Sequence, residues 1–186
     1  LLYNKYNIFE KLMPYYLFMG LILLILSFVK IIQPRFKLGF FSKSATVLLV
    51  IFFILHTAGL SLRWYISGHA PWSNGYESMI YIAWATVLAG FIFSRNSVIT
   101  LAATGVLSGL ILFVAHLNWL DPQVTNLVPV LKSYWLSIHV SMITASYGFL
   151  ALGALLGFIS LLLFALRSKT SEVRINLAIL ELNTIN

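Results

Sequence analysis

Residues 134–166 read YWLSIHVSMITASYGFLALGALLGFISLLLFAL, and no other part of the chain constrains the structure as strongly. The stretch contains no Asp, Glu, Lys or Arg and is longer than the ~20 residues that cross a bilayer as a helix. At ~1.5 Å per residue it would extend about 50 Å as a helix, against a hydrocarbon core of ~30 Å. We therefore predict a membrane helix over 134–166 whose first dozen or so residues protrude from the bilayer.

Four further apolar runs precede this one, each near the length of a membrane-spanning helix. They are residues 12–29, 45–62, 76–93 and 98–115. Apolar residues make up 60% of the chain and charged residues 9%, whereas a soluble domain carries roughly 25% charged residues. The alternating segments of about ten residues that mark a membrane β-barrel are absent from the sequence. The sequence predicts an all-α polytopic membrane helix bundle, with residues 1–186 forming one transmembrane domain of about five spans.

The basic residues between the runs predict the orientation of the bundle. Eight lie in the connections that follow the first, third and fifth runs: Lys30, Arg35, Lys37, Lys43, Arg95, Arg167, Lys169 and Arg174. Four lie on the other side: Lys5, Lys11, Arg63 and Lys132. By the positive-inside rule the first group is cytoplasmic. We expect a periplasmic N-terminus, a cytoplasmic C-terminus and external loops at 63–76 and 116–133.

The two ends of the chain suggest a part of something longer. The sequence opens on Leu1 with no initiator Met, and residues 171–186 are apolar again. We interpret 171–186 as a cytoplasmic amphipathic helix or the approach to a sixth span, and expect the chain to be a fragment or a processed piece.

The net charge of +7 does not indicate a nucleic-acid partner, because the basic residues are spread between the apolar runs. With no cysteine, the chain can form no disulfide, no thiolate metal site and no covalent haem link of its own. The four histidines include no pair at i, i+3 or i+4, which argues against a zinc centre. We predict no catalytic residues.

Aromatic residues gather in or beside the external loops. Four of the five Trp lie there: Trp64, Trp72, Trp119 and Trp135. An interfacial aromatic belt is the plain alternative, but a belt forms at both membrane faces. We favour an aromatic-lined site outside the membrane.

His139 is the residue most suggestive of chemistry. Trp135 lies four residues before it and Lys132 seven, so the three share one helix face. An imidazole can ligate haem iron, an indole can lie along the porphyrin and an ammonium can meet a propionate. The alternative is an interfacial histidine hydrogen-bonded to a neighbouring helix.

The other ionisable residues are open to two interpretations. His56 lies within a predicted span, where an ionisable group marks a functional site by default, for example a haem site, although a structural hydrogen bond fits equally well. His69 and His116 lie in or beside the external loops, where single histidines usually face solvent. Asn74 and Glu77 have the spacing of a capping box at the start of the third span.

Two stretches resemble the CcsA/ResC family of system II cytochrome c biogenesis. Residues 68–78, GHAPWSNGYES, are similar to a family segment that reads roughly Gly-x-x-Pro-x-Ser-Asn-x-Tyr-Glu-Ser before a membrane helix. Residues 129–140, PVLKSYWLSIHV, are similar to the segment that carries the family's first periplasmic histidine. The resemblance implies a multi-pass protein of the bacterial inner membrane that binds haem b and presents it at the periplasmic face to apocytochrome c.

The resemblance also assigns residues and partners. It makes His139 one of two periplasmic axial ligands of the haem iron. From the overlong helix itself we expect Tyr134 and Trp135 to bind the haem beside His139, with the Trp72 loop as a neighbour. The resemblance implies a CcsB/ResB-type partner, as a subunit or a fused domain, within a cytochrome c synthase complex. The family's Trp-rich segment and later histidines are absent from this sequence, so we expect this piece alone to be inactive in attachment.

Two rival interpretations stay open. A non-catalytic scaffold or small-molecule transporter would have the same composition, but a transporter commonly has repeated halves, and the sequence shows no internal repeat. A haem-bearing quinol oxidoreductase would have paired histidines within its spans, and only His56 lies there.

Overall fold

The computed structural model describes residues 7–33, 35, 39–94, 97–117, 120–124, 133–166 and 172–183. Its elements are α2 (Ile8–Ile32), α3 (Gly39–Ser67), α4 (Gly75–Phe93), α5 (Val98–Ala115), α6 (Tyr134–Ala165) and α7 (Glu172–Asn183). The described residues contain no strand, and five helices, α2 to α6, are long and apolar enough to cross a membrane. The predicted all-α bundle with about five spans is confirmed.

The helices run farther than the apolar stretches at the start of the chain. We expected spans at 12–29 and 45–62, whereas α2 and α3 extend several residues beyond both ends of each. The added turns contain polar residues, such as Glu10 at the start of α2, Lys43 at the start of α3 and Arg63 near its end. The two helices end only at Gln33 and Gly68. Gly68 has a φ of +70°, a conformation that ends a helix and favours glycine.

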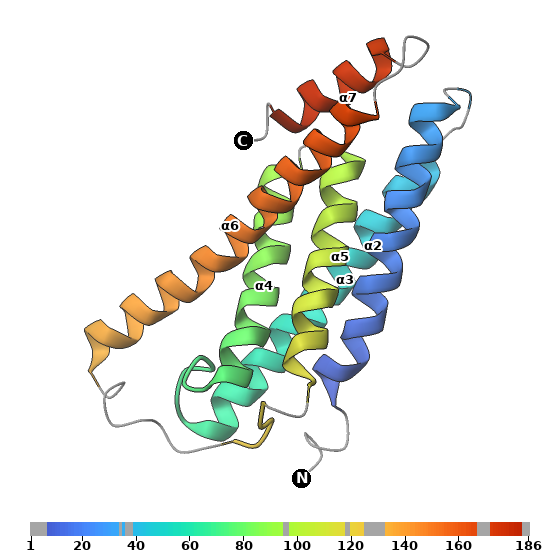
Figure 1. The fold of residues 1–186 in the computed structure, drawn as a ribbon. Coiled ribbons are helices and arrows are strands. Elements are labelled where there is room, and N and C mark those ends of the chain that lie inside the picture. Colours follow the sequence, from blue (N-terminus) through green and yellow to red (C-terminus); the bar gives the residue numbers. More distant parts are fainter. Residues whose placement is uncertain are drawn as a thin grey trace.

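Consecutive helices alternate in direction, so the connections gather at two ends of the bundle (Figure 1). One end holds the start of α2, the 68–74 loop, residues 116–117 and 120–124, and the start of α6. The opposite end holds α7, which packs against α6 and buries Ile175, Ala178 and Leu182. The Arg174 guanidinium donates to the carbonyl oxygens of Ile31 and Ile32, at 2.7 and 2.8 Å.

The closest packing joins α2 to α5 through small residues, which let two helix backbones approach each other. A Cβ added at Gly20 would lie 2.2 Å from the backbone nitrogen of Val106. One added at Gly109 would lie 2.7 Å from the backbone nitrogen of Leu17. Only glycine lets the two backbones approach this closely.

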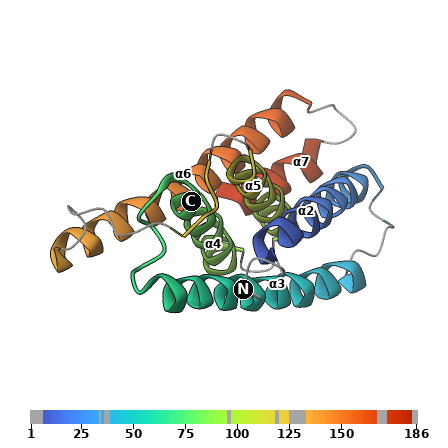
Figure 2. The same ribbon diagram turned by 90° about the horizontal axis from the view of Figure 1, so that it is seen from below.

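Helix α6 packs on the bundle along only part of its length. Its buried residues begin at Thr144 and continue with Gly148, Leu152, Leu156, Ile159 and Leu163, whereas the turns before Thr144 leave the other helices (Figures 1 and 2). A Cβ added at Gly148 would lie 2.9 Å from the carbonyl oxygen of Ile82 on α4, which marks where the contact tightens. Two further glycines of α6, Gly153 and Gly157, have no described residue packed against them.

Candidate functional site

The first turns of α6, which leave the bundle, carry three of the predicted site residues: Tyr134, Trp135 and His139. Ser133 occupies the N-cap position, with extended backbone, and the helix starts at Tyr134. The side chains of Tyr134 and Trp135 are 74% and 78% exposed, and their ring centroids lie 6.0 Å apart. His139 is also exposed. Lys132, the predicted cation of this group, lies outside the described residues.

His139 faces away from the bundle. Nine residues separate it from Gly148, which packs on α4, and at 3.6 residues per turn nine residues place the two on opposite faces of the helix. Trp135, one turn earlier, shares the face of His139. A planar ligand could therefore lie against this face without displacing any helix of the bundle.

Trp72 belongs to a separate group of aromatic rings on α3, α4 and the loop between them. Its ring centroid lies 5.7 Å from that of Trp64 and 4.9 Å from that of Tyr81. The row continues inward through Trp84, whose ring stacks on Tyr81 at 5.7 Å and whose Nε1 donates to the Thr57 hydroxyl at 2.9 Å. In the described part of the chain no ring contact joins Trp72 to Tyr134 or Trp135, although both groups lie at the same end of the bundle.

This end of the bundle contains a buried ion pair, between Arg63 and Glu77, that the sequence analysis does not predict. The Arg63 Nε donates to Glu77 Oε1 at 2.9 Å, and the two side chains are 1% and 0% exposed. Arg63 lies in the last turns of α3 and Glu77 in the first turn of α4, joined by a short loop. The sequence indicates only that the two residues lie near each other, because a short loop between two antiparallel helices brings their adjoining ends together. It does not indicate that their side chains pair.

Glu77 also organises the loop in front of it. Its backbone N–H donates to the Asn74 side chain at 2.8 Å, which confirms the predicted cap. Its Oε2 accepts hydrogen bonds from both the backbone N–H and the hydroxyl of Ser73, at 2.9 and 2.6 Å. The carboxylate therefore holds the residue next to Trp72 as well as Arg63.

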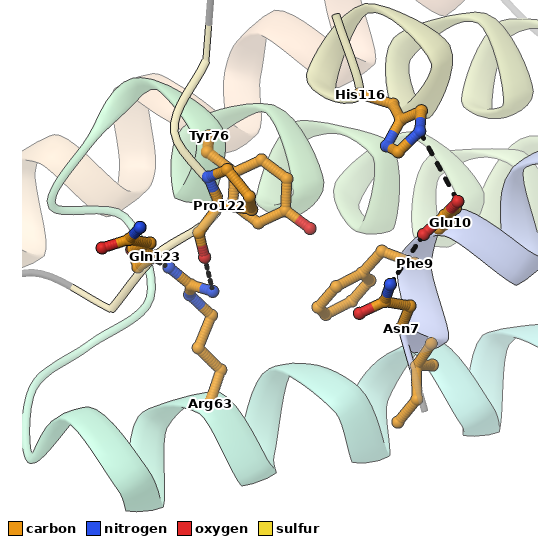
Figure 3. A pocket seen from close by; sticks show the side chains of 9 residues that line it. Asn7, Phe9, Glu10, Arg63, Tyr76, His116, Pro122 and Gln123 are labelled. Atoms are coloured by element: carbon orange, nitrogen blue, oxygen red, sulfur yellow. Dashed lines mark hydrogen bonds and ion pairs between the residues drawn. The ribbon is translucent and has the colours of Figure 1, made fainter. Parts of the chain in front are cut away.

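A cleft of about 280 Å³ opens beside Arg63, between the starts of α2 and α4 (Figure 3). The lining residues named in Figure 3 are Asn7, Phe9, Glu10, Arg63, Tyr76, His116, Pro122 and Gln123. On one wall the His116 Nε2 lies 3.6 Å from Glu10 Oε1, and both side chains are about half exposed, 54% and 45%. His116 is the C-cap residue of α5.

His56 is completely buried between α2, α3 and α4. Its Nε2 lies 3.0 Å from the carbonyl oxygen of Ile80, and its ring packs against Phe9 and Tyr16 at centroid distances of 5.3 and 6.0 Å. A haem could ligate this imidazole only after Phe9 and Tyr16 moved aside. The surroundings of His56 favour the structural interpretation.

His69 is buried in the loop, and its Nδ1 lies 3.1 Å from the Ala70 carbonyl oxygen. Across the described ranges, no group of three or more His, Asp or Glu side chains is placed to hold a metal ion. This end of the molecule therefore offers a ligand the exposed imidazole of His139, with the exposed rings of Tyr134 and Trp135 close to it in sequence.

Comparison with known proteins points to one family. The family described as "Cytochrome C assembly protein" matches residues 72–185. Protein NrfI of Wolinella succinogenes is 48% identical over 167 residues, which are 90% of this chain and 18% of that protein. The cytochrome c biogenesis protein CcsA of Prochlorococcus marinus is 36% identical over 137 residues, which are 72% of this chain and 42% of that protein. CcsA of Synechococcus sp. strain CC9605 is 42% identical over 109 residues, which are 55% of this chain and 35% of that protein.

The chain thus spans less than half the length of the relatives it matches, from about a fifth of NrfI to two fifths of a CcsA. The matched region contains Trp72, Glu77 and the whole of α4 to α6, with His139.

Proposed function

The chain belongs to the cytochrome c assembly protein family, and on that premise we propose that it binds haem and presents it for covalent attachment to apocytochrome c. The family expected from residues 68–78 and 129–140 is confirmed by the match and by the similarity to CcsA and NrfI. Because the chain covers only part of those relatives, the activity of the whole protein is a proposal.

His139 is the proposed axial ligand of the haem iron. One observation carries this assignment: α6 is long enough to hold an exposed imidazole beyond the packed bundle, with exposed Trp135 one turn away on the same face. These two side chains fit one side of a haem, since imidazole ligates iron and an indole covers porphyrin. Tyr134 lies next to Trp135 and would widen that surface.

The other side of the haem needs residues from elsewhere. The His139 face turns away from α4, so no described helix can supply the second axial ligand there without a rearrangement. We propose that this ligand comes from residues outside the described ranges or from a CcsB/ResB-type partner. Trp72 and its row of rings would then border the site from the α3–α4 side.

In the proposed reaction, haem b is the substrate and the protein's part is ligation and positioning. A cysteine S–H of the apocytochrome adds across a haem vinyl group, so that one C–S and one C–H bond form and no electron acceptor is needed. Holding iron and porphyrin in place brings the vinyl edge to the peptide, which makes the addition effectively unimolecular.

We place the protein in the bacterial inner membrane with this end of the bundle in the periplasm. The excess of Lys and Arg at the opposite end supports that orientation, through Lys30, Arg35, Lys43 and Arg174. Apocytochrome c is matured outside the cytoplasm in this proposal, so the active face and its substrate meet on the same side.

The haem spectrum of the protein tests the proposal. We expect the full-length protein, purified from cells, to carry haem, and His139→Gly in that protein to remove the haem or shift its visible absorption bands. His116→Gly is the matched control, because His116 lies in the cleft beside α5 and away from α6. A spectrum that His139→Gly leaves unchanged would contradict the assignment.

A further inference from the structure

Arg63 brings together three parts of the chain. Its Nε donates to Glu77 Oε1 on α4, and its Nη1 and Nη2 donate to the carbonyl oxygens of Pro122 and Gln123, each at 2.9 Å. Its guanidinium carbon lies 5.1 Å from the centre of the Tyr76 ring (Figure 3). One buried side chain therefore joins the end of α3, the start of α4 and the 120–124 segment.

The geometry depends on a guanidinium. Its three nitrogens point in fixed directions in one plane, and each meets a different acceptor. A lysine would carry the same charge, but its single ammonium cannot reach a carboxylate and two carbonyl oxygens in that arrangement.

Stability alone does not explain such a pair. Burying two charges carries a desolvation penalty that their attraction often fails to offset, so buried pairs are weak evidence for stability. This pair instead lies where it can hold two connections in place, the 68–74 loop and the 120–124 segment. Glu77 holds Ser73, next to Trp72, while Arg63 holds Pro122 and Gln123, on the path from α5 to α6.

We propose that Arg63 is a positioning residue for the haem-binding face. It fixes the 68–74 loop and the 120–124 segment against the ends of α3 and α4, so that Trp72 and residues 120–124 are in place before a ligand arrives. The part that concerns haem rests on the proposed function, whereas the fixing of the two connections does not.

Spin labels test directly whether Arg63 fixes the 120–124 segment against α3. The chain contains no cysteine, so Tyr65→Cys and Val124→Cys can be labelled without removing a native thiol. Both side chains are accessible, at 87% and 39% exposure. We expect a narrow distance distribution between the labels in the otherwise unchanged protein, measured by pulsed electron resonance in detergent.

The Arg63→Lys variant should broaden that distribution, because it keeps the charge and loses the donors to Pro122 and Gln123. Arg63→Met should broaden it further if the protein still folds. Thr46→Val is the matched control on the same helix: it removes the hydroxyl bond to Ser42, at the other end of α3, and should leave the distribution narrow. A distribution as narrow in Arg63→Lys as in the control would overturn the proposal.

Haem content tests the link to the site. In protein purified from cells, Arg63→Lys should hold about tenfold less haem, since losing a residue that orients ligands commonly costs about 10–100-fold in affinity. Thr46→Val should hold as much haem as the unchanged protein. Normal haem content in Arg63→Lys, together with a broadened distribution, would refute positioning of the haem face. If the unchanged protein holds no haem, the proposed function fails, and the spin-label result alone decides whether Arg63 fixes the 120–124 segment.

Discussion

Arg63 Nε and Glu77 Oε1 lie 2.9 Å apart at the junction of α3 and α4, in side chains that are 1% and 0% exposed. Removing one partner leaves the other charge buried and uncompensated, which typically costs about 3–5 kcal/mol. We expect Glu77→Leu or Arg63→Met to lower the free energy of unfolding by about this amount, measured by denaturant unfolding in detergent. The double variant should lose less than the sum of the two singles. Strictly additive losses would show that the two side chains do not interact.

The close contact between α2 and α5 predicts that the stability of the fold depends strongly on the size of the side chain at position 20. In Gly20→Ala the new methyl group would collide with the α5 backbone at Val106 and Gly105, at 2.2 and 2.7 Å. Overpacking of this kind typically costs about 1–3 kcal/mol, and here the neighbour is backbone that cannot rotate away. Thermal unfolding in detergent measures the loss. Gly153→Ala is the control, because no described atom lies within 4 Å of its added Cβ; equal losses in both variants would contradict the packing.

A substitution of His56 tests whether this residue is a structural histidine or an intramembrane haem ligand. Its Nε2 lies 3.0 Å from the Ile80 carbonyl oxygen, in a fully buried environment. We expect His56→Leu to destabilise the fold by about 0.5–1.5 kcal/mol, because the buried hydrogen bond between the imidazole and the Ile80 carbonyl oxygen is lost, and to leave the visible haem spectrum unchanged. Loss of a haem band in a protein that still folds would assign His56 to haem.

Single cysteines test the orientation, since the chain has none of its own. Val124→Cys lies at the end that we place in the periplasm, and Arg35→Cys at the opposite end. A thiol reagent that does not cross membranes should label Val124→Cys in intact cells whose outer membrane has been permeabilised. It should label Arg35→Cys only after the inner membrane is opened. The reverse pattern would invert the assignment of the two faces.

The number and approximate position of the spans could be predicted because length and apolarity are sufficient to define a membrane helix. The run at 98–115 and helix α5 coincide, since Ser97 caps the start and the apolar residues stop where the helix stops. The starts and ends of α2 and α3 could not be found this way. Polar residues at a membrane interface continue a helix as readily as apolar ones, and no proline or glycine marks the boundary at Glu10 or Arg63.

Individual residues of the candidate site could be predicted from the sequence, but the contacts between them and the direction in which they face could not. Glu77 was interpreted from its spacing to Asn74, and that cap is present. Its second role, as the partner of Arg63, depends on how closely two helices approach, which a spacing does not encode. In the same way, the face shared by Trp135 and His139 follows from helical periodicity, whereas its direction, away from α4, follows only from where Gly148 packs.

Chemical rescue at His139 tests the central claim most directly. In His139→Gly the helix keeps its course and a space replaces the imidazole, so free imidazole can occupy the ligand position. We predict that haem bound to the purified protein loses or shifts its visible absorption bands in His139→Gly, and that added imidazole restores them in part and in proportion to its concentration. His116→Gly should show neither change. Unaltered bands in His139→Gly, or altered bands that imidazole does not move at any concentration, would contradict the assignment of His139 as the haem ligand.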